Sequence, residues 1–501
     1  MTRNTILSLF LSFLCTGGNY AAEVSWDVGL TKNREVIIAQ GVLNNESNRT
    51  ILYIGSLDGE KSGSVNLDEL AKTYAEIAKP EDINLIVISN ANPDGDQLEF
   101  PPSGQAYTEN TVSHVLWRWV GSHAPDLIII DTDNDFGFRE AIRNDGIAGF
   151  GSIPIINLSS ANHSIEYLLA NSGIQHSPAR VELERRIART PQIVAEQLAS
   201  IYGHDFSTPV YVPGMSVIGR LRLGYIEEVE ELLAPYQDGQ SFDISNSSTL
   251  AGQLVFAEHA ARTGNKNSLE LTLRAADLAF DESGAPLEVA PMHYEMSDSF
   301  FMATPLLAKA GALTGNEKYF DMALRHVTYM RNMLLRDNRL YRHSPEADVA
   351  WGRGNGFPAL GLALTLSDFP ATHPGRDLIL GMLVDHLEAL LPYQDFDGMW
   401  HEVIDYPGSF SEISSTAMIG TAIKRGLDKG WLQKETYQPV LDRAWKAVKI
   451  RTSVDGVFIN ACTSTGKMTS LDSYLDRLAI FDHDDRAGGM VMNFAIEMAG
   501  L

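Results

Sequence analysis

Asp298 is the residue best suited to acid–base chemistry in this chain. It lies in the segment HYEMSDSFFMATPLLAKAGALTG (residues 293–315), where apolar side chains follow it closely. A carboxyl group held among apolar rings resists ionisation, and the resulting rise in its pKa suits a general acid that works near neutral pH. A second interpretation is that Ser297 or Asp298 caps the helix that begins here. Both interpretations can hold together.

The segment LYRHSPEADVAWGRGNGFPALG (residues 340–361) gathers groups that suit the recognition of a sugar carboxylate. Glycines let a ligand approach the backbone, aromatic rings can form a wall, and a fixed cation can bind a carboxylate. We expect a Gly-rich loop that leads into a helix and carries His343, Trp351, Arg353, Asn355 and Phe357. The alternative is a tight turn in which Trp351 stacks on Arg353.

Two later segments add polar and aromatic groups. The first, DGMWHEVIDYPGSFSEISSTAMIGTAIKRGLDKGW, presents Trp400, His401 and Glu412 before another helix. The second, SYLDRLAIFDHDDRAGGMVMNFAIE, closes the chain. Each segment is a weak signal by itself, and their order and spacing are what make the set specific.

A helical repeat must position these segments. After about residue 180 the strand signal fades and helical periodicity continues to the end. The stretch AARTGNKNSLELTLRAAD, from residue 260, resembles GALTGNEKYFDMALRHVT, from residue 311. Each predicts a helix end, a Thr-Gly-Asn turn and a second amphipathic helix, which is an αα-hairpin. About six such pairs fit this half, either as a closed (α/α)₆ toroid or as an open solenoid, and long mixed loops favour closure.

The first half of the chain has a different rhythm. Four runs rich in Ile and Val alternate with amphipathic helical stretches: TILYIGS, INLIVISNA, DLIIIDT and IPIINLS. Buried strands that alternate with helices predict an α/β domain with a mostly parallel sheet. The chain is therefore expected to be multi-domain, with the α/β domain over residues 23–180 and an all-α barrel over residues 190–501.

Charge and the N-terminal residues restrict the possible partners. The net charge is −25 and no run of Lys and Arg is present, so nucleic-acid binding is not expected, and an anionic sugar would need local cations. Residues 1–22 have one early Arg, a short apolar run and small residues, which predicts a signal peptide and a periplasmic or secreted protein. No other segment is expected to span a membrane. Cleavage there would leave Cys462 alone, without an intrachain disulfide.

The C-terminal half resembles glycoside hydrolase family 105, the unsaturated rhamnogalacturonyl hydrolases, and the related family 88. The resemblance rests on DSFFMATPLLA, WGRGNGF, MWHEVIDYPGSFSEISSTAM and DDRAGGM. It implies an (α/α)₆ barrel without metal or cofactor, acting on oligosaccharides that carry a terminal unsaturated uronic acid after lyase cleavage. It also implies Asp298 as general acid/base and a substrate pocket that contains His343, Trp351, Arg353, Phe357, Trp400 and His401. Phe357 stands where these families usually have Trp.

One departure from the family pattern affects the mechanism. The families commonly have a second aspartate on an earlier barrel helix, but the matching stretch here, FDISNSSTLAG, has Ser and Asn at the corresponding position. Asp243 is near but not aligned. Two alternatives therefore stay open. One is a conventional inverting glycosidase that pairs Asp298 with Glu412 or Asp405; the other is a non-catalytic glycan-binding protein.

The N-terminal half resembles the zinc carboxypeptidase family through YIGSLDGEKSGS, NANPDGD and IIIDTDND. That resemblance implies His, Glu and His as zinc ligands, but Asp58, Lys61 and Asp133 stand at those positions. A protonated lysine cannot bind zinc, and the two His ligands are absent. We therefore expect a degenerate, metal-free domain that either binds glycan or braces the barrel mouth, with an active zinc peptidase as the alternative. The sequence does not indicate the preferred uronide or the oligomeric state.

Overall fold

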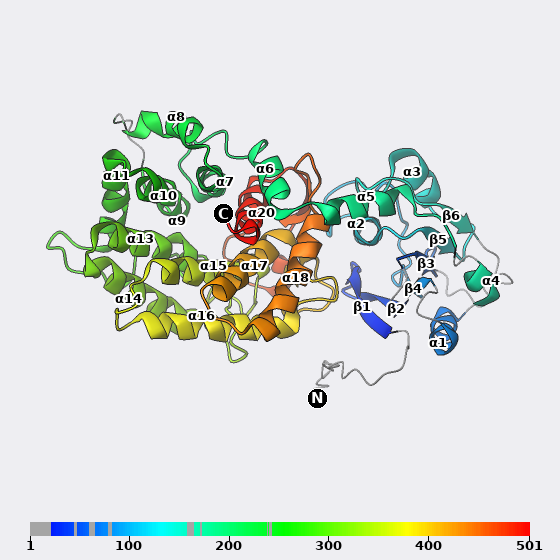
Figure 1. Ribbon diagram of the computed structural model, residues 1–501. Coiled ribbons are helices and arrows are strands. Elements are labelled where there is room, and N and C mark those ends of the chain that lie inside the picture. Colours follow the sequence, from blue (N-terminus) through cyan, green and yellow to red (C-terminus); the bar gives the residue numbers. More distant parts are fainter. Residues whose placement is uncertain are drawn as a thin grey trace.

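The structure is a computed structural model that describes residues 22–44, 48–59, 66–78, 83–157, 165–170, 173–237, 239 and 243–501. It has two lobes, an N-terminal α/β lobe and a larger helical lobe (Figure 1). The predicted signal peptide lies outside the described residues, apart from Ala22. In the part of the chain that is described, no helix is both long and apolar enough to cross a membrane.

The N-terminal lobe is built on a six-stranded sheet with the order β1-β2-β4-β3-β5-β6. Strands β3 to β6 run parallel to their neighbours among themselves, and β1 and β2 are antiparallel. The strands are β1 (Ala22–Leu30), β2 (Val36–Leu43), β3 (Thr50–Ile54), β4 (Asn84–Ile88), β5 (Leu127–Ile130) and β6 (Ile155–Asn157). The mostly parallel sheet predicted from the sequence agrees in part with this arrangement.

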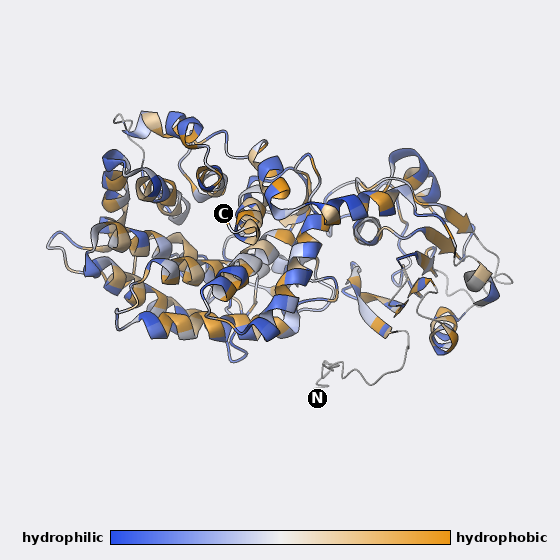
Figure 2. Ribbon diagram, in the orientation of Figure 1, coloured by the Kyte–Doolittle hydropathy of each residue, from blue (hydrophilic) through white to orange (hydrophobic). Residues whose placement is uncertain are grey.

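Alternate residues of the central strands feed two separate apolar cores. Tyr53 and Ile129 pack with α1 (Leu67–Ile77) on one face, while Leu52 and Ile128 pack with α2 (Thr111–His123) and α3 (Phe138–Asp145) on the other. Because both faces are covered, the strands read as continuous apolar runs, which made them recognisable in the sequence. The hydropathy colouring shows these apolar strands between more polar helices (Figure 2).

Six inner helices form a closed ring in the helical lobe. Each contacts the next, and the last contacts the first. In ring order they are α7 (Tyr211–Arg222), α10 (Leu254–Thr263), α13 (Thr304–Thr314), α15 (Gly352–Asp368), α17 (Ile413–Asp428) and α20 (Asp485–Ala499). This closure confirms the (α/α) barrel and excludes the open solenoid.

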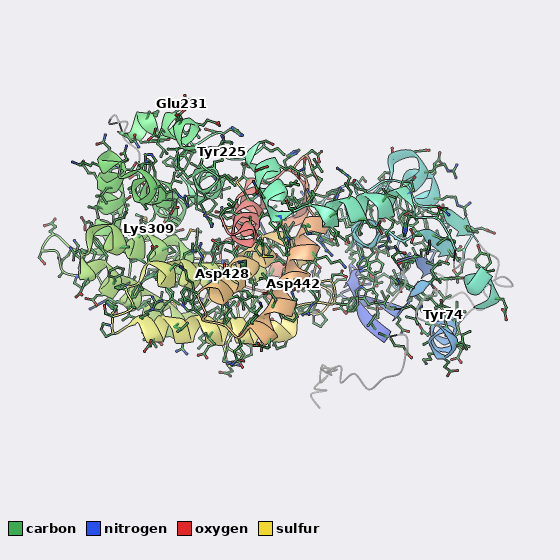
Figure 3. All side chains as sticks on the ribbon, viewed as in Figure 1. Tyr74, Tyr225, Glu231, Lys309, Asp428 and Asp442 are labelled. Carbon is green, nitrogen blue, oxygen red and sulfur yellow. The ribbon has the colours of Figure 1, made fainter. Side chains whose placement is uncertain are left out.

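An outer helix packs beside each inner helix. These outer helices are α6 (Pro191–Ala199), α8 (Ile226–Gln237), α11 (Lys266–Ala276), α14 (Glu317–Leu334), α16 (Arg376–Leu390) and α18 (Lys434–Ile450). Short helices α9 (Ser247–Gly252) and α12 (Ser299–Met302) precede α10 and α13, and α5 (Pro178–Ala188) lies between the two lobes. Exposed acids on the helices, among them Glu231, Asp428 and Asp442, reflect the net negative charge (Figure 3).

The two matching Thr-Gly-Asn sequences form the predicted turns. Gly264 and Gly315 follow α10 and α13 with φ of 72° and 70°, a left-handed conformation that glycine adopts without steric cost. Asn265 and Asn316 then cap α11 and α14 through their side-chain oxygens. Each turn reverses the chain between an inner and an outer helix, and so the inner helices begin at the same end of the barrel.

Candidate active site

Asp298 immediately precedes α12, and its side chain makes no capping hydrogen bond. The interpretation that Asp298 caps this helix is therefore wrong. The carboxylate Oδ2 lies 3.1 Å from Nε2 of His343, although the two groups are not aligned as a hydrogen bond. Asp298 is only 8% exposed, and Phe300 and Phe301 behind it are fully buried. Its carboxyl group remains available for chemistry.

His343 connects Asp298 to a tyrosine far along the chain. Its Nδ1 lies 2.8 Å from the hydroxyl of Tyr474, which belongs to the short helix α19 (Leu471–Leu475). Burial raises the pKa of Tyr474 to about 12, so its hydroxyl stays protonated and can donate. A neutral His343 that accepts this hydrogen bond carries its own hydrogen on Nε2, the nitrogen that faces Asp298.

Trp351 and Arg353 lie at the start of α15 and are almost completely buried. The Trp351 ring is 4.5 Å from the His343 ring, and the Arg353 guanidinium is 5.0 Å from the Trp351 ring. Arg353 donates to the carbonyls of Cys462 at 2.9 Å and Thr463 at 2.7 Å. The structure therefore brings Asp298, His343, Trp351 and Arg353 together, and two of the hydrogen bonds that Arg353 donates go to protein carbonyls.

A loop leads into a helix at Trp351 as predicted, but α15 begins at Gly352, so Gly352, Gly354 and Gly356 lie in the helix and not in the loop. The glycines of α15 are needed because other backbone segments pass very close. A Cβ on Gly352 would lie 2.4 Å from the carbonyl oxygen of His401, and one on Gly361 would lie 2.3 Å from that of Phe300. The glycine pattern therefore reports close packing of α15 against its neighbours, where we had predicted room for a ligand.

A buried acidic cluster beneath Trp351 was missed in the sequence. Glu402 accepts from the Trp351 indole at 2.9 Å and from the Cys462 thiol at 3.1 Å, and it is fully buried. Burial, followed by the nearby charge of Glu412, raises the pKa of Glu402 to about 8. Burial by itself lowers the pKa of Arg353, but the surrounding acidic groups raise it overall. The only sequence signal was an acid directly after the Trp400–His401 pair.

Phe357 packs inside the barrel and is fully buried. Its ring stacks on Phe301 at 5.5 Å and meets Tyr211 edge-on at 5.8 Å. Tyr211, at the start of the first inner helix, was also missed. Burial raises the pKa of its hydroxyl, and this hydroxyl interacts electrostatically with Asp298 and with the guanidinium groups of Arg353 and Arg486. Arg486 belongs to the DDRAGGM motif and pairs with Asp484, which caps α20.

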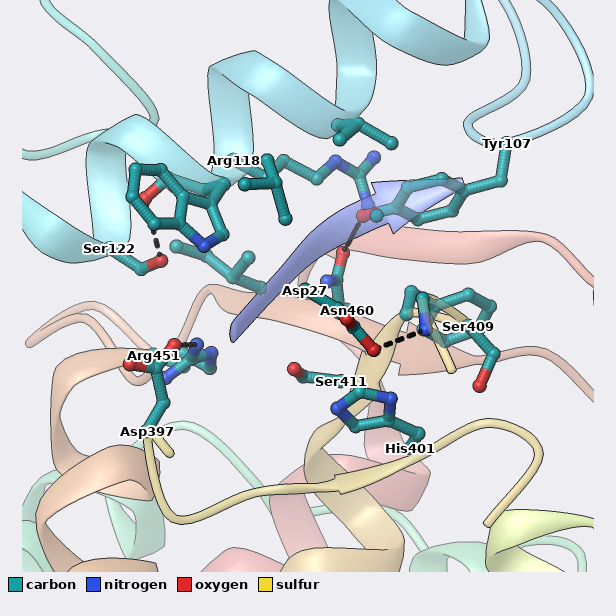
Figure 4. A pocket seen from close by; sticks show the side chains of 17 residues that line it. Asp27, Tyr107, Arg118, Ser122, Asp397, His401, Ser409, Ser411, Arg451 and Asn460 are labelled. Carbon is teal, nitrogen blue, oxygen red and sulfur yellow. Dashed lines mark hydrogen bonds and ion pairs between the residues drawn. The ribbon is translucent and has the colours of Figure 1, made fainter. Parts of the chain in front are cut away.

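Trp400 and His401 have other neighbours in the structure. The buried Trp400 indole donates to the carbonyl of Leu390 at 2.9 Å, and His401 pairs with Asp395 at 2.9 Å. Burial works against the proton on His401, but the hydrogen bond and charge of Asp395 raise its pKa overall. His401 lines a small polar cavity of about 30 Å³ between the lobes, which has room for a few waters (Figure 4). A substrate-binding role for these two residues stays a prediction.

The acids considered as a second catalytic carboxylate are engaged elsewhere. In the stretch expected to hold the family aspartate, Asn246 caps α9 and Asp243 is exposed. Glu412 caps α17 and accepts from the backbone of Ser414, Ser415 and Cys462, in addition to the Ser414 hydroxyl. Asp405 pairs with Arg336 at 2.7 Å.

The carboxypeptidase-like motif in the N-terminal lobe shows a turn and a polar contact. Asn92 is buried and exchanges hydrogen bonds with the backbone of Asp96, and Gly95 has φ of 68°. Asp58 accepts from the Thr132 hydroxyl at 2.6 Å, Asp133 is exposed, and Lys61 lies outside the described residues. Across the residues with described positions, no three His, Cys, Asp or Glu side chains gather as a metal site. The resemblance to zinc carboxypeptidases stays a prediction.

The C-terminal region matches a known enzyme family. Residues 252–501 match the family model described as Glycosyl Hydrolase Family 88. The chain is 28% identical over 235 residues to the unsaturated rhamnogalacturonyl hydrolase YesR of Bacillus subtilis, covering 45% of this chain and 63% of that protein. It is 29% identical over 177 residues to an unsaturated 3S-rhamnoglycuronyl hydrolase of Formosa agariphila, which covers 32% of this chain and 47% of that protein. The chain thus spans less than two thirds of each relative's length.

Solved structures show the same fold. A possible member of family 105 from Salmonella enterica superposes with a TM-score of 0.52 at 20% identity, covering 68% of this chain and 98% of that one. A family 105 glycoside hydrolase from C. acetobutylicum superposes with a TM-score of 0.53 at 18% identity, covering 62% of this chain and 99% of that one. The homologues and the family match support an unsaturated uronyl hydrolase, a glycoside hydrolase, as the enzyme type of the helical lobe.

Proposed function

We propose that the helical lobe removes a terminal 4,5-unsaturated uronic acid from oligosaccharides left by polysaccharide lyases, with Asp298 as general acid/base. One observation carries the proposal. The nearly buried carboxyl group of Asp298 makes no capping hydrogen bond to α12, and its Oδ2 lies 3.1 Å from Nε2 of His343. The family match over residues 252–501 and the names of the relatives favour this substrate class.

The chemistry follows from the substrate's double bond. The ring oxygen donates electrons into the bond between carbons 4 and 5, so carbon 4 is the basic position. A protonated Asp298 delivers its proton to carbon 4, and positive charge develops at carbon 5 and the ring oxygen. Water adds to carbon 5 and gives its proton to the same carboxylate, which restores the acid. The hemiketal then opens and releases the rest of the oligosaccharide.

This route differs from ordinary glycoside hydrolysis because no group attacks the anomeric carbon. Ordinary hydrolysis needs two carboxylates on opposite sides of the scissile bond. In the proposed route one carboxyl group serves first as acid and then as base, which agrees with the lack of an aligned aspartate in the stretch FDISNSSTLAG. Nε2 of His343 lies 3.1 Å from Oδ2 of Asp298, close enough to limit the positions that this carboxyl group can take.

We propose that Arg486 contributes to binding the substrate carboxylate, together with the predicted Arg353. Arg353 is 1% exposed and bonded to two carbonyls, whereas the Arg486 side chain is 20% exposed. Both guanidinium groups lie near enough to influence the Tyr211 hydroxyl, as does Asp298. A carboxylate beside Tyr211 would meet these cations, which an acidic protein needs at the point where it accepts an anion.

We propose that the N-terminal lobe has no peptidase activity and that the chain is exported. The Asp58–Thr132 contact supports the first statement, since a short hydroxyl bond uses the carboxylate that would otherwise face a metal. Export rests on the composition of residues 1–22. Fractionation of the host cell, with sequencing of the mature N-terminus, tests it.

A panel of lyase-generated unsaturated oligosaccharides tests the proposed hydrolase. The expected result is loss of the ultraviolet absorbance of the conjugated double bond, with release of the shortened oligosaccharide. Saturated oligosaccharides of the same sugars serve as the matched control, because they lack the bond that Asp298 would protonate. Cleavage of the saturated series would favour the conventional glycosidase, and binding without turnover would favour the glycan-binding alternative.

A further inference from the structure

The segment of residues 458–482, here called the 458–482 hairpin, lies between the candidate active site and the N-terminal lobe. It contains β9 (Phe458–Cys462), α19 and β10 (Ala479–Asp482), and the two strands pair antiparallel. Both strands and the intervening helix belong to the helical lobe by sequence. Their outer contacts, however, are made by residues from the first 120 positions of the chain.

On its inner side the hairpin supplies three contacts to the site. The Tyr474 hydroxyl bonds to Nδ1 of His343, and the carbonyls of Cys462 and Thr463 accept from Arg353. The two side chains that these contacts hold, His343 and Arg353, are completely or almost completely buried. The position of this hairpin therefore sets the orientation of the His343 ring and of the Arg353 guanidinium.

On its outer side two arginines of the N-terminal lobe hold the same hairpin. Arg34, in the turn between β1 and β2, lies 2.6 Å from Asp476 and 3.7 Å from Asp472. Arg118, on α2, donates to the Asn460 side chain at 2.7 Å and to the carbonyl of Ala479 at 2.9 Å. Arg34 thus contacts acids on both sides of Tyr474 in the sequence, and Arg118 joins the two strands (Figure 4 labels Arg118 and Asn460).

The two arginines differ in burial, and only the more exposed one can be substituted without a large effect on stability. Arg118 is 6% exposed, so its loss would leave buried acceptors unpaired. The partners of Arg34 are open to solvent, with side-chain exposures of 76% for Asp472 and 47% for Asp476. Exposed ion pairs contribute little to global stability, so an effect of Arg34 on catalysis would come from positioning.

We propose that the N-terminal lobe acts as a positioning domain, in which Arg34 and Arg118 fix the 458–482 hairpin so that Tyr474 holds His343 against Asp298. This inference rests on the proposed function of the helical lobe. It assigns to the N-terminal lobe the bracing role, and it makes Arg34 and Arg118 positioning residues, since neither contacts Asp298, His343 or Tyr474 in the described contacts.

The test compares Arg34→Ala, Arg34→Lys, Tyr474→Phe and the double variant Arg34→Ala/Tyr474→Phe in the full-length protein. Arg185→Ala is the matched control, because Arg185 is exposed and pairs only with Glu182 on its own helix among the described ion pairs. Arg34→Ala should lower kcat by about 10-fold with a small change in KM, since small displacements of catalytic groups are costly. Arg34→Lys should restore part of the rate.

Two readouts separate positioning from a general structural effect. The pH profile of kcat should shift in the same direction in Arg34→Ala and Tyr474→Phe, because the first loosens and the second removes the contact between Tyr474 and Nδ1 of His343. The double variant should be no slower than Tyr474→Phe alone. Rates for Arg34→Ala equal to those of Arg185→Ala, or losses that multiply in the double variant, would overturn the proposal.

Hydrogen–deuterium exchange of the unliganded protein tests the bracing of the hairpin without any need for hydrolysis, so the two proposals can fail separately. Arg34→Ala should raise exchange in peptides from the 458–482 hairpin and from residues 340–357, and Arg185→Ala should leave both unchanged. If no unsaturated oligosaccharide is hydrolysed by the wild type, the proposed function fails and the exchange result alone decides on the bracing. Unchanged exchange in Arg34→Ala would overturn the bracing even in an active enzyme.

Discussion

The hydroxyl of Tyr474 lies 2.8 Å from Nδ1 of His343, although 131 residues separate the two in the sequence. The opposite nitrogen of the same ring lies 3.1 Å from the Asp298 carboxylate. A tyrosine, a histidine and an aspartate from three separate segments therefore form one line. The surroundings of the Asp298 carboxyl group therefore depend on residues far from it in the chain.

Glu402→Gln should change the pH dependence of stability. Burial raises the pKa of Glu402 from 4.5 to about 8, so the folded protein holds this proton more tightly than the unfolded chain does. The stabilisation is complete below the unfolded pKa and is lost as the pH rises toward 8. The amide cannot ionise and keeps an oxygen for the Trp351 indole. The Tm of Glu402→Gln should therefore rise relative to wild type between about pH 4.5 and 8.

Glu231→Gln, an exposed substitution on α8, is the control for that titration. Its Tm should run parallel to wild type over the same pH range. A Glu402→Gln curve that also runs parallel to wild type would show that Glu402 ionises normally in the folded protein.

Arg353→Ala should lower stability as well as substrate affinity. Its guanidinium donates to the carbonyls of Cys462 and Thr463, and removal would leave buried acceptors unpaired at a cost of about 1–3 kcal/mol each. Arg486→Ala should also raise KM, and it should lower the Tm as well, because the buried carboxylate of Asp484 would lose its ion-pair partner. Thermal unfolding and initial rates on the same preparations check both. An unchanged Tm in Arg353→Ala would show that its carbonyl contacts contribute nothing.

Phe357→Trp should destabilise the barrel even though tryptophan is usual at this position in the related families. Phe357 is fully buried between Phe301 and Tyr211, so a larger ring must displace its neighbours. Overpacking of this kind costs roughly 1–3 kcal/mol. Denaturant unfolding measures the loss. A variant as stable as wild type would mean that the space around Tyr211 already fits the larger ring.

Chelator treatment should leave uronide hydrolysis intact, and the purified protein should contain no stoichiometric zinc. The proposed reaction moves protons only, and Asp58 bonds to Thr132. Elemental analysis before and after dialysis, paired with rate measurements, provides the check. Loss of zinc together with loss of activity would contradict the proposed chemistry. Bound zinc whose removal leaves the activity unchanged would indicate a separate zinc site in the N-terminal lobe.

The parts of the fold that the sequence predicted are those with strong local periodicity. The four apolar runs became β3 to β6, and the two Thr-Gly-Asn repeats became helix-reversing turns with Gly264 and Gly315 at their centres. Strands β1 and β2 were missed, although the β1 sequence AEVSWDVGL alternates apolar and polar residues as a half-buried strand does.

The sequence predicted only those site residues that lie in short motifs with other polar or aromatic groups. Asp298, His343, Trp351 and Arg353 do lie together, while Trp400 and His401 have contacts elsewhere. Tyr474 and Tyr211 could not be identified because their roles depend on helices that meet only in the closed ring. The glycines of α15 were misread as loop residues, since sequence cannot distinguish room for a ligand from close backbone packing.

The hydrolysis rate of Asp298→Asn on an unsaturated uronide tests the central claim most directly. The amide keeps the shape of the carboxyl group but cannot cycle a proton, and loss of an acid/base group typically costs about 10²–10⁴ in rate. Because Asp298 makes no capping bond, the variant should keep the wild-type Tm. The account predicts a folded protein with a rate at least about 100-fold lower. A folded Asp298→Asn protein that keeps more than about a tenth of the wild-type rate would contradict it.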